Sequence, residues 1–176
     1  MKFFKLKEGF TLLEVVVALG LLILIFGSVV SLAILTREAE QASKNNLIAA
    51  YLAKEGQDLV RYRRDKNYLD AVSAFNSLVA EEVNNSVYYF YIDYTNSIRS
   101  ASANDVQSSV PLKYFESFYG NGNDGENTIF KRLVTTTYHE AAGLMPAYID
   151  VKVEVYWKSD TKQDTYTLNS QLSDWN

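Results

Sequence analysis

A chain of 176 residues with 48% hydrophobic residues and no cysteine has room for one modest domain, and disulfides cannot hold it together. The net charge of −4 makes nucleic acid the least expected partner, because phosphate backbones attract basic proteins. Composition therefore argues against two large domains, a disulfide scaffold and a generic nucleic-acid binder.

The first feature along the chain is a basic head followed by a long apolar segment. Three lysines lie in the first nine residues, and the apolar segment 10–35 follows them. As a helix, this segment would span about 39 Å, which exceeds the roughly 30 Å of a bilayer's hydrocarbon core. The basic head is expected to stay in the cytoplasm, so the remainder of the chain is expected on the outer side of the membrane.

Glu14 is the only ionisable residue of this apolar segment. An intramembrane carboxylate is costly when it is unpaired, so its presence predicts a functional role and a cationic partner. A cleaved signal peptide, an uncleaved signal anchor and a Glu14 that merely reaches the membrane interface are the alternatives. The segment is long for a signal peptide, and neither kind of signal accounts for an acid at this position.

The residues before Glu14 complete a pattern. A basic leader ends in Gly9, Phe10 follows, and the sequence TLLE that ends in Glu14 opens the apolar helix. This pattern resembles the processing site of type IV pilins and type II secretion pseudopilins. The resemblance implies that a prepilin peptidase cleaves between Gly9 and Phe10 and that the new N-terminal Phe10 is N-methylated. It also implies that Glu14 meets the N-terminal amine of Phe10 in a neighbouring subunit.

The resemblance further implies a location and a set of partners. The subunit would wait in membrane lipid as a single-pass protein with a cytoplasmic leader and an extracytoplasmic C-terminal domain. An inner-membrane machine would then assemble it with other pilin subunits into a pilus or pseudopilus. Small residues at Ala18, Gly20 and Gly27 would let neighbouring helices approach, or reflect ordinary glycine use in membrane helices. We expect a minor pilin; the alternatives are a type II secretion minor pseudopilin and a membrane-anchored adhesion or binding domain that never polymerises.

The helix is expected to continue beyond the apolar segment. No proline precedes Pro111, so nothing interrupts a helix from Phe10 to about Arg64. Residues 36–67 are expected to be its amphipathic half, with apolar and small residues following helical spacing on one face: Ile48, Ala49, Ala50, Tyr51, Leu52, Ala53, Gly56, Leu59 and Val60. The arginines at positions 61, 63 and 64 are expected to be the solvated end of this helix.

Residues 68–176 are expected to form a β-sheet head domain. A short second helix is expected around residues 69–80, a tyrosine-rich strand at 87–94, a loop at 95–109 and a short or edge strand within 110–119. Alternating patterns predict three further strands, at 129–138, 149–157 and 165–172. The predicted fold is α+β, with a long N-terminal helix (a transmembrane half and an amphipathic half) packed on a C-terminal antiparallel sheet. By resemblance to pilins, it would have a lollipop shape, with residues 1–9 as its leader.

No catalytic, cofactor or metal site is expected. The chain has no cysteine, and its single histidine, His139, is expected at the surface beside a strand end. The glycine-rich stretch 120–125 offers oxygen ligands to calcium, but its spacing does not match a calcium loop, so a plain hairpin turn is expected there. The chain is therefore expected to be a substrate of processing enzymes and not an enzyme itself.

Overall fold

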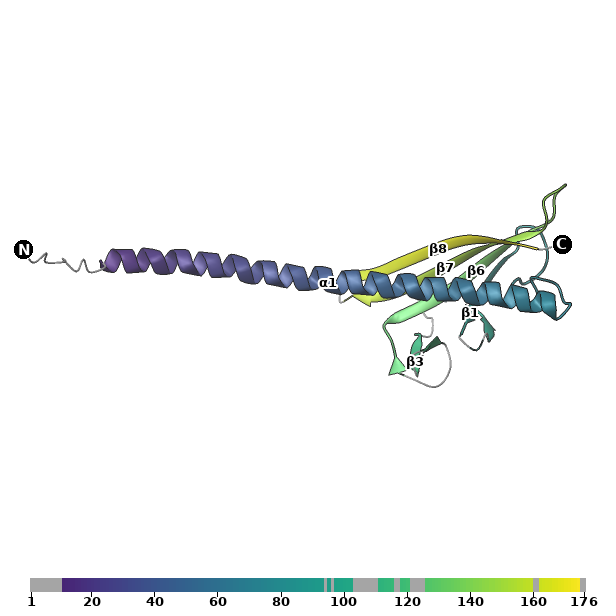
Figure 1. The fold of residues 1–176 in the computed structure, drawn as a ribbon, viewed down its shortest axis with the longest axis horizontal. Helices are drawn as coiled ribbons and strands as arrows, with labels where there is room; N and C mark the ends of the chain where they lie inside the picture. Colours follow the sequence, from purple (N-terminus) through teal and green to yellow (C-terminus); the bar gives the residue numbers. More distant parts are fainter. Residues whose placement is uncertain are drawn as a thin grey trace, which may run out of the picture. The chain divides into compact units, whose positions relative to one another are not determined.

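The computed structural model describes residues 11–93, 95, 97–102, 111–115, 118–120, 126–159 and 162–174. The chain divides into two units, residues 1–44 and 45–176, and each is described by itself. One long helix and a set of antiparallel strands make this an α+β protein, as predicted (Figure 1). The elements are α1 (Leu12–Leu69), β1 (Val87–Ile92), β2 (Ile98–Ser100), β3 (Lys113–Phe115), β4 (Phe118–Gly120), β5 (Glu126–Asn127), β6 (Phe130–His139), β7 (Tyr148–Ser159) and β8 (Lys162–Ser173).

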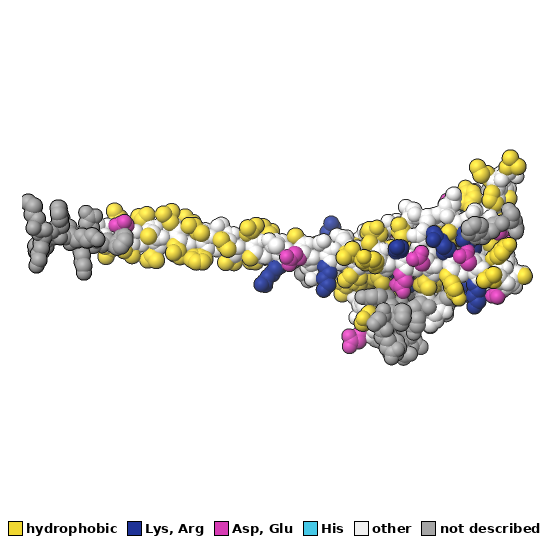
Figure 2. Space-filling model, in the orientation of Figure 1, with side chains coloured by type: hydrophobic (Ala, Val, Ile, Leu, Met, Phe, Trp, Pro, Cys, Tyr) yellow, Lys and Arg dark blue, Asp and Glu magenta, His cyan; other side chains and the backbone are white. Residues whose placement is uncertain are grey.

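In the first unit, the described chain is almost entirely helical. The part of α1 up to residue 44 has exposed side chains at every position, and hydrophobic side chains cover it in the view of Figure 2. The helix is long and apolar enough, by length and composition, to cross a membrane. An apolar surface of this extent needs lipid or other protein to cover it.

In the second unit, one stripe of α1 is buried against the sheet. Its members recur every three or four residues, as the helical repeat requires: Asn45, Ala49, Leu52, Ala53, Gly56, Val60, Arg64 and Asn67. The predicted amphipathic face is thus largely confirmed, but Tyr51 is 66% exposed. Tyr51 follows Ala49 by two residues, which places it about 200° further around the helix and away from the stripe.

The main sheet has five strands in the order β2-β1-β6-β7-β8, and every neighbouring pair is antiparallel. Strands β6, β7 and β8 confirm the three strands predicted from alternation, with ends that differ by a few residues. In β7, every second side chain is buried, from Ile149 to Trp157, while Asp150 and Lys152 are exposed. The buried side chains face α1, because the backbone of Gly56 lies close to the side chain of Val153.

The prediction of a second helix in the connection between α1 and the sheet is wrong. A second helix was expected around residues 69–80, but α1 ends at Leu69 and the residues after it, up to 80, form turns and bends; Ala71 and Ser77 have φ angles of 56° and 62°, which no helix continues through. The amide of Asn67 instead donates to the carbonyl oxygens of Ala74 (3.1 Å) and Asn76 (2.7 Å).

The arginine prediction is also wrong in part. Arg64 is only 4% exposed, because it lies on the buried stripe of α1. It donates to the carbonyl oxygen of Ser173 (3.2 Å) and pairs with Asp65 (2.7 Å). It therefore holds the end of β8 against the helix.

The segments between β1 and β6 also differ from expectation. The predicted loop at 95–109 contains β2, which pairs with Phe90–Ile92. The carboxylate of Asp93 turns the chain into this strand by accepting bonds from the backbone N–H groups of Thr95 and Ser97, both at 3.0 Å. A second sheet has the order β4-β3-β5, so β4 and β5 both pair with β3 and not with each other. The plain hairpin turn predicted for 120–125 is therefore wrong in its pairing; residues 121–125 themselves lie outside the described residues.

Candidate functional site

Glu14 lies in the first turn of α1 and is exposed. Its backbone N–H donates to the hydroxyl oxygen of Thr11 (3.3 Å), so Thr11 caps the helix and Glu14 occupies the third helical position. An acid in the first turn also interacts favourably with the helix dipole. Of the other two predicted site residues, Gly9 and Phe10 lie outside the described part of the chain. The carboxylate of Glu14 has no partner among the described residues.

The hydroxyl groups of the apolar helix differ from Glu14 in this respect. Ser28 donates to the carbonyl oxygen of Ile25 (2.7 Å), and Ser31 donates to that of Gly27 (3.0 Å). Both hydroxyls are therefore satisfied by the helix itself, and they need nothing from the surroundings. Between Leu12 and Leu35, Glu14 is the one polar side chain that must find its partner elsewhere.

The same stretch of α1 offers open positions for close helix contacts. A Cβ atom added to Gly20 or to Gly27 would meet no other atom within 4 Å. Both glycines therefore leave shallow places on an apolar surface, where a neighbouring helix backbone can approach.

In the second unit, the sheet is fixed to α1 by a buried arginine. Arg132 on β6 is 1% exposed, and its Nη1 donates to the carbonyl oxygen of Leu52 (3.0 Å) and to the carboxylate of Glu55 (3.0 Å). Its Nη2 donates to the carbonyl oxygen of Ile92 at the end of β1 (2.8 Å). Burial lowers the pKa of Arg132 from its ordinary value, and the charge of Glu55 opposes that change. The side chain thus joins α1, β1 and β6 at one point.

Sequence reasoning missed Arg132, although a signal was present. From Phe130 to Tyr138, every even position is buried, and Leu133 is buried as well; Arg132 is the charged residue in the even series. A buried arginine needs an acid and a gap in the facing element, and Glu55 and Gly56 supply both.

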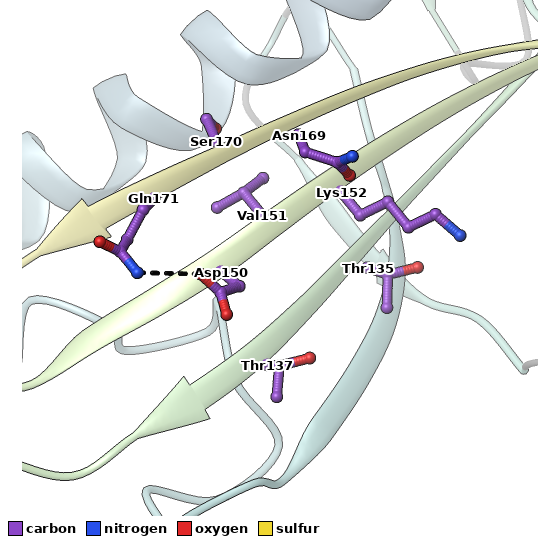
Figure 3. Close-up of a pocket in the computed structure, with 8 residues that line it drawn as sticks. All are labelled: Thr135, Thr137, Asp150, Val151, Lys152, Asn169, Ser170 and Gln171. Atoms are coloured by element: carbon purple, nitrogen blue, oxygen red, sulfur yellow. Dashed lines mark hydrogen bonds between the residues drawn. The ribbon is translucent and has the colours of Figure 1, made fainter.

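The opposite face of the main sheet carries an open hollow of about 530 Å³, here called the outer-face hollow. Eight residues line it (Figure 3), and six of them form two cross-strand rows over β6, β7 and β8: Thr135, Lys152 and Asn169 in one row, and Thr137, Asp150 and Gln171 in the other. The charged members already have partners, because Asp150 accepts a bond from Gln171 (3.1 Å) and Lys152 pairs with Glu154 (2.7 Å). The hollow offers hydroxyl and amide groups to a polar ligand.

His139 lies at the end of β6, as predicted, and its ring stacks on Tyr148 with centroids 4.5 Å apart. Its Nε2 lies 2.9 Å from Asp150. Within the described part of the chain, no group of three or more histidine, cysteine, aspartate or glutamate side chains is placed to hold a metal ion. No family model, curated protein or solved structure matches this chain.

Proposed function

We propose that this protein is a type IV pilin-like structural subunit, in the role of a minor pilin or of a type II secretion minor pseudopilin. A prepilin peptidase would cleave between Gly9 and Phe10, and Phe10 would then be N-methylated. The mature chain would assemble into a filament through the N-terminal half of α1. The observation that carries the proposal is Glu14, an acid in the first turn of an exposed apolar helix whose carboxylate has no partner among the described residues.

The chemistry of Glu14 supports a contact between subunits. Cleavage would free an ammonium group on Phe10, only four residues before the carboxylate. In the apolar surroundings of a helix bundle, an unpaired charge of either sign is costly, but the two together form a tolerable pair. Pairing Glu14 of one subunit with Phe10 of the next would also fix the axial offset between them.

The rest of the apolar helix supports transfer from lipid into a filament. Its side chains would exchange contacts with lipid for contacts with equivalent helices, and the glycines at positions 20 and 27 leave room for those contacts. The assembly machine would therefore have to extract the helix from lipid, and Glu14 would be the polar side chain that needs a new partner in the filament.

The first test is the N-terminus of the protein from membranes of cells with and without a prepilin peptidase. The proposal expects a chain that begins at methylated Phe10 only when the peptidase is present. A chain that keeps residues 1–9 in both would refute it.

The second test separates assembly from folding. Glu14→Gln keeps the shape of the side chain and removes its charge, so mature subunits should accumulate in the membrane but fail to enter filaments at the normal rate. Glu38→Gln is the matched control, because Glu38 is exposed on the same helix but lies beyond the apolar segment. Equal incorporation of both variants would contradict the role of Glu14.

A second candidate function is a membrane-anchored binding domain that never polymerises. The outer-face hollow favours it, because the residues that line it include hydroxyl and amide side chains that a polar ligand could contact. This candidate expects binding of a polar ligand that is lost in Asn169→Ala and unaffected by Glu14→Gln.

A further inference from the structure

The turn between β6 and β7 carries an exposed apolar tip. Residues 141–147 read AAGLMPA and contain no ionisable side chain. Leu144 is fully exposed and Met145 is 70% exposed, and the turn projects beyond the strand ends in Figure 1, with hydrophobic atoms at its end in Figure 2. A continuous run of exposed apolar residues is unfavourable in water, and it indicates a surface that another molecule covers.

Backbone hydrogen bonds fix the conformation of the tip. The backbone groups of Ala142 and Met145 exchange two hydrogen bonds, of 3.1 and 3.0 Å. Gly143, with a φ of 62°, is the first residue between them, a position where an L side chain would be strained. At the base, the N–H of Asp174 donates to the carbonyl oxygen of Ala147 (2.8 Å). The turn therefore presents Leu144 and Met145 on a short, fixed hairpin.

An apolar groove lies elsewhere on the same unit, here called the α1–β8 groove. It has a volume of about 340 Å³, and the residues that line it include Leu47, Ala50, Tyr51 and Lys54 of α1 and Tyr166 and Leu168 of β8. Leu47 is 58% exposed and Tyr51 is 66% exposed, so this side of α1 is uncovered although it is apolar. Tyr51, which lies away from the buried stripe of α1, is thus part of this second, exposed apolar surface.

The tip cannot reach the groove of its own chain. The base of the tip is at the pair Tyr148–Ser173, whereas Leu168 and Tyr166 precede Ser173 by five and seven residues in β8. At about 3.4 Å per residue, that separation is roughly 17–24 Å, and the tip points away from it. A contact between tip and groove must therefore join two molecules.

The charges beside the two surfaces are complementary. Glu140 is the only charged residue between Arg132 and Asp150, and it lies at the base of the tip. Lys54 is the only charged residue among those that line the groove. No carboxylate among the described residues forms a salt bridge with Lys54, so its ammonium group is available to Glu140 of another subunit.

We propose that the tip of one copy of this chain docks into the α1–β8 groove of a second copy, with Leu144 and Met145 between Tyr51 and Leu168 and with Glu140 beside Lys54. Because the two surfaces differ and lie apart on each molecule, the contact is heterologous, and repeating such a contact builds either a closed ring or an open helical filament. The filament is the arrangement that agrees with the proposed function. The inference rests on the proposed assembly of this chain into a filament. Two side chains bury too little area to hold two copies alone, so the contact adds to those made by α1.

The chain contains no cysteine, which allows a direct test by crosslinking. Filaments of a Leu144→Cys, Tyr51→Cys double variant should form a ladder of disulfide-linked dimers, trimers and higher species on mild oxidation. Each single variant should give no ladder. Leu144→Cys with Gln171→Cys is the matched control, because Gln171 is also exposed but lies on the outer face of the sheet.

A charge exchange provides a second measurement that needs no oxidation. Glu140→Lys should reduce filament yield severalfold, and Glu140→Lys with Lys54→Glu should restore it. Filaments that form normally but give no ladder in the Leu144→Cys, Tyr51→Cys variant would overturn this inference and leave the proposed function intact. A wild-type chain that never forms filaments would overturn both. A tip that contacts lipid in the full chain reconstituted into phosphatidylcholine vesicles, without any ladder in the filaments, would assign the tip to lipid and overturn the inference.

Discussion

Gly56→Ala is the sharpest test of how α1 packs on the sheet. At a solvent-exposed helix position without tertiary contacts, this change should stabilise the protein by about 1 kcal/mol, because alanine is the better helix former. In this protein, the new Cβ would lie 2.9 Å from Cδ of Arg132 and 3.0 Å from Cγ1 of Val153. The contact with Arg132 is shorter than real Cβ atoms show, and the contact with Val153 is tighter than most, so at least the side chain of Arg132 must shift.

The magnitude follows from what can move. The guanidinium group of Arg132 is held by the carbonyl oxygens of Leu52 and Ile92, so its side chain cannot swing aside without breaking those bonds. Overpacking a core costs about 1–3 kcal/mol, and the pinned arginine places this site in the upper half of that range. After the gain in helix propensity is subtracted, the expected net loss of stability is about 1–2 kcal/mol.

The assay is denaturant unfolding of the full chain in detergent micelles, followed by tryptophan fluorescence, since Trp157 is buried in the core. Gly20→Ala is the control, because a Cβ there meets open space, and it should leave the unfolding midpoint of the head unchanged. Adding Arg132→Met to Gly56→Ala should reduce the cost of the glycine change, since the two residues are in contact. A Gly56→Ala protein that is more stable than wild type would refute the close packing of Arg132 on this helix.

Three further predictions follow from the same contacts. Arg132→Met should destabilise the head by about 3 kcal/mol, because it leaves the buried carbonyl oxygen of Ile92 without this donor. A loss below about 1 kcal/mol in denaturant unfolding would contradict the role of Arg132 as a clamp, that is, as the side chain that joins α1, β1 and β6. Burial and the nearby charge of Glu154 raise the pKa of Tyr156 above its ordinary value, so the stability that its neutral phenol supports is complete below about pH 10 and is lost as the pH rises further. Tyr156→Phe should therefore reduce the loss of stability above about pH 10, measured as the unfolding midpoint against pH. The same loss in the variant and in wild type would show that Tyr156 does not cause it. Leu144→Asp should leave the stability of the head within about 0.5 kcal/mol of wild type, because the side chain is fully exposed; a larger loss in the same assay would show that the tip packs on its own chain.

The elements with a strong hydrophobic repeat were predictable from the sequence. The absence of proline before Pro111 and the spacing of Ala49, Leu52 and Val60 indicated the helix, and alternation from Ile149 to Trp157 indicated the longest strands. In both cases, the residues that determine the element lie within it. Glu14 could be singled out for the same reason, since its apolar neighbours surround it in the sequence.

The parts that were mispredicted depend on partners far away in the chain. Strand β2 is short and polar, and it exists because its main chain pairs with β1. The turns after α1 depend on bonds from the side chain of Asn67 to carbonyl groups that follow it. The alternation in β6 marks Arg132 as a charged residue at a buried position, but its partners Leu52 and Ile92 are far away in the chain and no local pattern identifies them.

The clamp at Arg132 also has a consequence for the order of folding. Its two carbonyl partners lie 80 and 40 residues earlier in the chain, so neither bond can form until β6 has been synthesised and has reached the helix. Until then, Leu52 of α1 and Ile92 of β1 lack the donor that joins them, and closing such long loops slows folding. In a chain synthesised from its N-terminus, the side chain of Arg132 can therefore join α1, β1 and β6 only after the first 132 residues have been made.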